Sequence, residues 1–201
     1  MLQIRDFKEE DRQAYLEMAR DFYSSDASLF ELEEQKLEDT FNIGVKGSPL
    51  MRGLTLCEQE KPVGYALLAF YWSCEAGGLV VQAEELYFTP QSRGKGYGHQ
   101  YFQWLFAEYP QAKRFRLEVC PYNPKAKKLY EQLGGHRCQS GCRHSAVFEL
   151  DDFTVQHLEK QNHDKSMVSK ASQRQNSAPK ANCFRCAVLF YTHYRSKIIC
   201  P

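Results

Sequence analysis

The sequence has almost no net charge and no long apolar run, and both absences limit what the protein can do. Its 201 residues include 26 Lys and Arg against 25 Asp and Glu, a formal net charge of +1 at pH 7. No overall field therefore favours nucleic acid or a charged membrane surface. No apolar run approaches the ~20 residues that a membrane-spanning helix needs. The chain begins without the apolar core of a signal peptide, so we expect a cytoplasmic protein.

The two common glycine-rich nucleotide motifs are also absent. Three glycines cluster at Gly94, Gly96 and Gly98, a spacing that does not fit Gly-x-Gly-x-x-Gly. Gly-x-x-x-x-Gly-Lys-Ser/Thr does not occur anywhere in the chain. The motifs therefore predict neither a standard dinucleotide-binding protein nor a P-loop nucleotidase.

The composition is that of a soluble globular protein, with 43% hydrophobic and 25% charged residues. The length predicts one domain with an appendage. Residues 157–201 carry 2 acidic against 8 basic side chains and lose the regular apolar pattern. We therefore expect a domain at 1–152 and a basic polar tail at 153–201, partly disordered or peripheral. The eight cysteines are interpreted as buried or incidental thiols.

Apolar periodicity predicts ten elements in the order strand, two helices, three strands, helix, strand, helix, strand. The expected strands are 2–5, 54–57, 63–72, 79–88, 115–119 and 146–150, and the expected helices are 11–24, 29–41, 98–108 and 124–133. This order mixes hairpin-linked strands with helical crossovers. It predicts a mixed sheet in an α/β or α+β fold.

A glycine-rich basic segment, residues 91–98, lies between an expected strand and an expected helix. The N-terminus of a helix offers unpaired N–H groups and a positive dipole end, and both suit an anion. Glycine lets the backbone approach phosphate oxygens closely, and Arg93 and Lys95 can add charged contacts. The segment alone favours an anion site, with a flexible basic loop as the alternative.

Two motifs in this order resemble those of the GNAT family of N-acetyltransferases. Gln91-x-x-Gly94-x-Gly96 fits the family's pyrophosphate motif, Gln/Arg-x-x-Gly-x-Gly/Ala. The segment from Asn123 to Gly135 resembles its Asn-x-x-Ala-x-x-x-Tyr-x-x-x-Gly-Phe motif, with Gly135 in place of the usual Phe. The resemblance covers roughly residues 2–150.

The resemblance implies the GNAT fold, a mixed central sheet with helices on both faces and splayed fourth and fifth strands. It also implies acetyl-CoA as a substrate, with direct attack of an amine on the thioester in a ternary complex. The residues that it places at acetyl-CoA are Leu86, Tyr87, Phe88, Gln91, Ser92, Arg93, Gly94, Lys95, Gly96, Tyr97, Gly98, Asn123, Lys125, Ala126 and Tyr130.

The resemblance implies an acyltransferase, with Glu84, Glu85 and Tyr130 as the candidate catalytic residues. An attacking amine must lose a proton, and the two glutamates can accept it. Neighbouring strand residues point to opposite faces, so only one glutamate can face the acetyl group unless a bulge intervenes. Glu84 matches the base of polyamine acetyltransferases in the family and is preferred, with Glu85 left open. Tyr130 matches the family tyrosine that can protonate the departing thiolate.

Acidic residues between 31 and 39 favour a small cationic amine as acceptor, and the chain weakly resembles diamine acetyltransferases. A solvated helix face is the alternative interpretation of those acids. A protein N-terminus or a lysine is an alternative acceptor, and an acyl-CoA-binding sensor or interaction module is an alternative function. The resemblance allows a homodimer. We expect neither nucleic acid nor a membrane as partner.

A zinc site is a further alternative. His136, Cys138, Cys142 and His144 lie close in sequence, and Cys183-x-x-Cys186 follows in the tail. The first group has an irregular spacing for a structural zinc site. We therefore expect no metal, and a hairpin with incidental thiols at 136–144.

Overall fold

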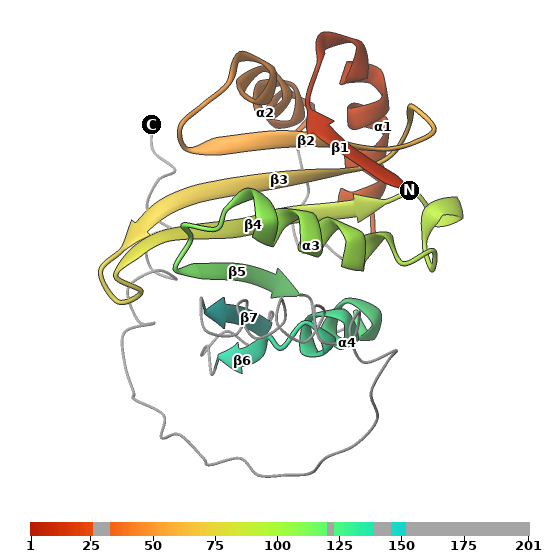
Figure 1. The fold of residues 1–201 in the computed structure, drawn as a ribbon. Coiled ribbons are helices and arrows are strands. Elements are labelled where there is room, and N and C mark those ends of the chain that lie inside the picture. Colours follow the sequence, from red (N-terminus) through yellow and green to blue (C-terminus); the bar gives the residue numbers. More distant parts are fainter. Residues whose placement is uncertain (26–32, 120–122, 139–145, 152–201) are drawn as a thin grey trace.

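The computed structural model describes residues 1–25, 33–119, 123–138 and 146–151. A seven-stranded mixed sheet runs through it in the order β1-β2-β3-β4-β5-β7-β6 (Figure 1). The strands are β1 (Leu2–Asp6), β2 (Met51–Glu58), β3 (Lys61–Ser73), β4 (Gly78–Phe88), β5 (Arg114–Val119), β6 (His136–Cys138) and β7 (Ala146–Asp151). The helices are α1 (Arg12–Tyr23), α2 (Glu34–Lys46), α3 (Tyr97–Glu108) and α4 (Pro124–Gln132), with short 3-10 turns at Glu9–Asp11 and Pro90–Ser92. The expected fold class is confirmed.

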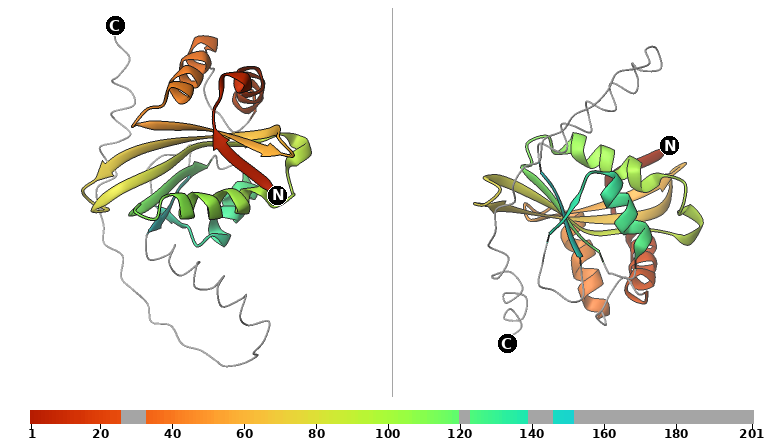
Figure 2. Two further views of the ribbon diagram at one scale, coloured as in Figure 1. Left: turned by 45° about the horizontal axis from the view of Figure 1, so that its top comes forward. Right: turned by 90° about the horizontal axis from the view of Figure 1, so that it is seen from below.

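Helices cover both faces of the sheet, α1 and α2 on one and α3 and α4 on the other (Figures 1 and 2). The alternation of side chains along each strand separates two apolar cores. The core beneath α3 and α4 contains Val81, Phe102 and Leu117, whereas the core beneath α1 and α2 contains Tyr65 and Phe41. Among the described residues, no helix combines the length and apolar character that crossing a membrane requires.

The helix expected at 29–41 ends five residues later, at Lys46. Val45 packs against the core beneath α1 and α2, and Gly47 then takes a φ of 79°, which terminates the helix. β6 was not expected as a strand, because three residues are too few for a periodic signal. It pairs with β7, in agreement with the hairpin interpretation of that region.

The remaining zinc candidates, Cys142, His144, Cys183 and Cys186, lie outside the described residues, as does the tail at 153–201. Within the described part of the chain, no group of three or more His, Cys, Asp or Glu is placed to hold a metal ion. The zinc alternative and the division at residue 152 therefore stay hypotheses.

A β-bulge at Glu84 changes which face the end of β4 presents. Leu67 of β3 pairs with Glu85 and Leu68 pairs with Ala83, so Glu84 is an extra residue. Before the bulge, Val81 and Ala83 pack in the core beneath α3. After it the alternation is reversed, and Tyr87 packs beneath α1.

β4 and β5 pair in parallel only near the beginning of each strand. Their register runs from Val80 opposite Arg114 to Ala83 opposite Leu117. β4 then continues to Phe88, and β5 to Val119, without further pairing between them in the described residues. The expected splay of the fourth and fifth strands therefore begins at the bulge.

Candidate active site

A solvent-open pocket lies where β4 and β5 separate. It contains about 510 Å³ of empty space and is closed on its other sides by the last turn of α1 and by α4. Its lining consists of Phe22, Ala83, Glu84, Glu85, Leu86, Glu118, Val119, Asn123, Ala126 and Tyr130. Three of these residues are glutamates and none is Lys or Arg, so the pocket favours positive charge.

The glycine-rich segment expected to bind phosphate leads from β4 into α3. Gly94 and Gly96 have φ values of 79° and 77°, a left-handed conformation that glycine adopts without strain. A Cβ atom added to either would meet nothing within 4 Å, so the space above their backbone is open. Gly96 is the N-cap of α3, and the N–H groups of the first helical turn have no partner within the helix. The segment therefore offers an accessible anion site.

The side chains of this segment have partners elsewhere in the protein. Lys95 Nζ lies 2.8 Å from Glu58 Oε2, and the Tyr97 hydroxyl donates a hydrogen bond to the same carboxylate. Arg93 donates to the Phe88 carbonyl oxygen at 2.9 Å and lies over the Tyr87 ring. These contacts leave the backbone N–H groups as the groups best placed for an anion.

Gly98 was also expected at acetyl-CoA, but its surroundings differ from the open space at Gly94 and Gly96. A Cβ atom there would lie 2.7 Å from Leu129 Cδ2, so its small size allows α3 to approach α4. Asn123 caps α4, with its side chain accepting a hydrogen bond from Ala126 N at 3.1 Å. Lys125 is exposed in the first turn of that helix.

Both candidate bases line the pocket, because the bulge places two consecutive glutamates at the same point. Glu84 is exposed and accepts a hydrogen bond from Gln82 Nε2 at 2.6 Å. Glu85 is only 8% exposed. Its Oε1 accepts a hydrogen bond from the Tyr23 hydroxyl, and its Oε2 accepts one from Tyr65 at 2.7 Å.

Burial raises the pKa of Glu85, and the nearby charge of Glu84 adds to this increase. The two tyrosine hydroxyls stabilise the carboxylate and lower the pKa of Glu85, but they do not cancel the effect of burial. The two glutamates thus differ in a way that matters for chemistry. Glu84 is accessible to a ligand, whereas both oxygens of Glu85 are already occupied.

Tyr130 lies between the pocket and the core beneath α3 and α4. Its ring contacts Phe102 and Phe148 at centroid distances of 5.6 and 5.7 Å, and its hydroxyl has no hydrogen-bond partner among the described residues. Burial raises the pKa of Tyr130 to about 12, so the hydroxyl keeps its proton at neutral pH. A donor must carry its proton, as Tyr130 does, but the raised pKa also makes this hydroxyl a weaker acid. Gly135, where the family motif has Phe, would place a Cβ atom 2.9 Å from the Tyr130 carbonyl oxygen.

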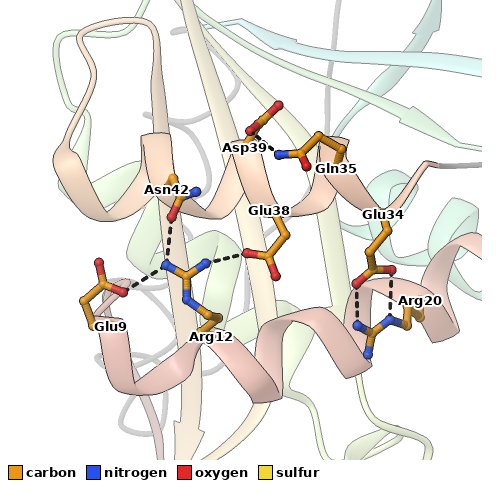
Figure 3. A network of polar contacts seen from close by, with 8 residues as sticks. All are labelled: Glu9, Arg12, Arg20, Glu34, Gln35, Glu38, Asp39 and Asn42. Atoms are coloured by element: carbon orange, nitrogen blue, oxygen red, sulfur yellow. Dashed lines mark hydrogen bonds and ion pairs between the residues drawn. The ribbon is translucent and has the colours of Figure 1, made fainter.

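The acidic helix does not supply the negative charge of the pocket. No residue of α2 lines it. Glu34 forms an ion pair with Arg20, and Glu38 forms one with Arg12, so both acids lie against α1 (Figure 3). Glu34 and Glu38 therefore fit the alternative interpretation of a helix face, with their charges balanced by arginines of the neighbouring helix, and Glu31 lies outside the described residues.

Sequence reasoning missed four residues around the pocket: Phe22, Tyr23, Tyr65 and Glu118. Phe22 and Tyr23 were assigned only to a helix, and Tyr65 only to a strand. They approach β4 because the bulge reverses its side-chain alternation. A bulge leaves no residue-type signal in a single sequence, so nothing in the chain pointed to these contacts.

Comparison with known proteins agrees with this geometry. The family model described as "Acetyltransferase (GNAT) family" matches residues 12–135. Comparison with curated proteins gave no match. The fold is similar to that of Arabidopsis thaliana NAA60 solved with a bisubstrate analogue, at 14% identity and a TM-score of 0.61, covering 75% of this chain and 98% of that one.

Two further structures share the fold. One is the spermidine N-acetyltransferase of Vibrio cholerae solved with CoA and spermine, at 18% identity and a TM-score of 0.59, covering 77% of this chain and 98% of that one. The other is the ribosomal-protein-S18-alanine N-acetyltransferase of Escherichia coli, at 17% identity and a TM-score of 0.56, covering 75% and 94%. The family model spans more than half of the sequence. The chain therefore belongs to the acetyltransferase (GNAT) family.

Proposed function

We propose that the protein transfers an acetyl group from acetyl-CoA to the primary amine of a small cationic acceptor. The observation that carries this proposal is the pocket between the separated ends of β4 and β5, which brings Glu84, Glu85 and Tyr130 together. A proton acceptor and a proton donor thus share one cavity. Family membership assigns the reaction class, and the chemistry of the pocket supports the acceptor class.

The residues of the chain suit acetyl-CoA. The open space above Gly94 and Gly96 lets pyrophosphate oxygens reach the N–H groups at the start of α3. Beyond Ala83, the edge of β4 that faces β5 has no strand partner among the described residues, so the backbone from Glu84 to Phe88 can bond an extended arm as an added strand would. Acetyl-CoA supplies an activated thioester carbonyl, and a β4 N–H there can polarise it.

Glu84 accepts the proton of the attacking amine in this proposal. It is exposed at the pocket, whereas both oxygens of Glu85 already accept hydrogen bonds from tyrosines. Tyr130, which keeps its hydroxyl proton at neutral pH, donates that proton to the departing thiolate. The two proton transfers are thus assigned to residues on different sides of one pocket.

A cationic acceptor follows from the charges of the lining. Glu84, Glu85 and Glu118 line the pocket together with the Phe22 ring, and no basic side chain of the described residues does. Arg116 lies 3.8 Å from Glu118 and offsets part of one of these charges. Carboxylates and an aromatic face both attract an ammonium group.

The test is release of free thiol from acetyl-CoA in the presence of single amines: polyamines, aminoglycosides, amino acids and peptides with a free N-terminus. We expect turnover with a polyamine or another small polycation, and a rate roughly 100-fold or more lower in Glu84→Gln. Glu118→Gln is the matched control, because it removes a carboxylate of the same pocket that has no assigned proton transfer. Tight CoA binding without turnover for any amine would favour a binding module and contradict the proposal.

A further inference from the structure

Two side-chain hydrogen bonds connect the last turn of α1 to β4. They lie on either side of a residue that lines the pocket. Phe22 lies on the pocket wall, between Asp21 and Tyr23 in the chain. The Tyr23 hydroxyl donates a hydrogen bond to Glu85, and Asp21 accepts one from the Tyr87 hydroxyl. We call these two hydrogen bonds, Tyr23–Glu85 and Asp21–Tyr87, the ties between α1 and β4. They lie on either side of Phe22, which lines the pocket.

The β4 residue of each tie is buried in the protein. Glu85 is 8% exposed and Tyr87 is 5% exposed, and Tyr65 fixes the second oxygen of Glu85 from β3 at 2.7 Å. The Phe22 ring meets three of the tyrosine rings edge-on, at centroid distances of 5.1 Å from Tyr23, 6.5 Å from Tyr65 and 6.4 Å from Tyr87. Such edge contacts add to the stability of an aromatic cluster. The position of Phe22 is therefore determined by β4 and β3 as well as by its own helix.

The bulge at Glu84 makes this arrangement possible. Without it, Glu85 and Tyr87 would continue the alternation of Val81 and Ala83 and face α3. With it, they face α1, and the extra residue Glu84 remains at the pocket. The same irregularity thus positions the proposed base and the two partners that hold the opposing wall.

We propose that Tyr23, Glu85, Tyr87 and Asp21 are positioning residues that hold Phe22 as a fixed wall of the acceptor pocket, facing Glu84. This inference rests on the proposed acetyltransferase function. A wall held in place reduces the entropy lost when an amine is oriented for attack. The Tyr23–Glu85 hydrogen bond does not involve residues 91–98, so it affects acceptor binding and leaves the phosphate site unchanged, whereas Tyr87 also contacts Arg93.

The experiment compares Tyr23→Phe, Tyr87→Phe and the double variant in steady-state kinetics and amide hydrogen exchange. Each change removes one hydroxyl and keeps the ring, including the Tyr87 ring that lies beneath Arg93. Tyr101→Phe is the matched control, because the Tyr101 hydroxyl on α3 is buried and has no hydrogen-bond partner among the described residues. We expect KM for the amine to rise roughly 10-fold in each single variant and further in the double variant.

Two other readouts separate this role from a general loss of stability. CoA affinity by calorimetry should stay within about twofold of wild type in Tyr23→Phe, because the Tyr23 hydroxyl contacts Glu85 and not residues 91–98. Amide exchange at residues 20–25 should accelerate in the tie variants and not in Tyr101→Phe. Absence of amine turnover in the wild type would reject the acetyltransferase function. Unchanged exchange, or an unchanged amine KM in an active enzyme, would overturn the positioning role.

Discussion

Alanine substitutions at Gly96 and Gly98 separate phosphate binding from helix packing. Gly96 has φ 77° and open space around a new Cβ atom, so Gly96→Ala creates no clash within the protein. Its internal cost is the left-handed conformation, roughly 1–2 kcal/mol for a residue with a Cβ atom. Gly98→Ala is sterically different, because its Cβ atom would lie 2.7 Å from Leu129 Cδ2. Overpacking of this kind costs roughly 1–3 kcal/mol, offset in part by the better helix propensity of alanine.

The two variants should thus lose similar stability and differ in CoA affinity. A methyl group on Gly96 would occupy the space through which we propose that a phosphate oxygen reaches the N–H groups at the start of α3. A hydrogen bond to a charged group contributes about 1.5–3 kcal/mol, which corresponds to roughly 10- to 150-fold in Kd. Gly98→Ala should change Kd by less than about threefold, because its methyl group points at α4.

Calorimetric titration with CoA measures the affinity, and thermal unfolding followed by circular dichroism measures the stability. Both variants are compared at a temperature where each is fully folded. The reasoning would be refuted by a Gly96→Ala protein that binds CoA as the wild type does, or by equal losses of affinity in the two variants.

Three further substitutions or truncations test separate parts of the account. Tyr130→Phe should lower kcat roughly 100-fold with little change in thermal stability, because its hydroxyl has no hydrogen-bond partner among the described residues; an unchanged kcat would remove it as proton donor. Asp11→Asn tests a pH effect: burial alone would raise the pKa of Asp11, but Arg5, the Lys8 amide and Thr55 together lower it. Its stabilising contribution is therefore present above the unfolded pKa of about 4 and is lost as pH falls through the folded value. Urea unfolding should show a loss of about 2–3 kcal/mol in Asp11→Asn at pH 7 that shrinks in acid, whereas a loss that is independent of pH would contradict this. Removal of residues 153–201 should leave kcat and both KM values within about twofold, since the described lining of the pocket is formed by residues 22–130; a larger change would reject the proposed domain boundary.

The sequence predicted those parts of the fold that depend on local pattern. The strand that ends at Phe88, the helix that follows the glycines and the helix that follows Asn123 all have strong local signals, from periodicity, turn residues and a capping asparagine. Gln91, Gly94 and Gly96 lie within six consecutive residues, so they are close together in the folded protein whatever the tertiary packing. Family resemblance, and not periodicity, supplied the splay of the two strands.

Contacts between distant segments could not be predicted. The acids of residues 31–39 were interpreted as a charged surface. In the structure, Glu38 and Glu34 instead form ion pairs with Arg12 and Arg20 of α1. The two glutamates of β4 were expected on opposite faces, and the bulge at Glu84 instead brings both to the pocket. Ion pairs and strand register depend on tertiary packing, which leaves no local pattern to recognise.

Acetyl transfer to an amine can be followed by mass spectrometry of the acceptor. Wild-type protein is incubated with acetyl-CoA and a polyamine, with Glu84→Gln and heat-inactivated protein as controls. We expect an acceptor that gains one acetyl group on nitrogen, in amounts equal to the CoA released, and far less product with Glu84→Gln. An unmodified acceptor across the whole amine panel, with CoA still bound at the loop from Gln91 to Gly96, would contradict this expectation.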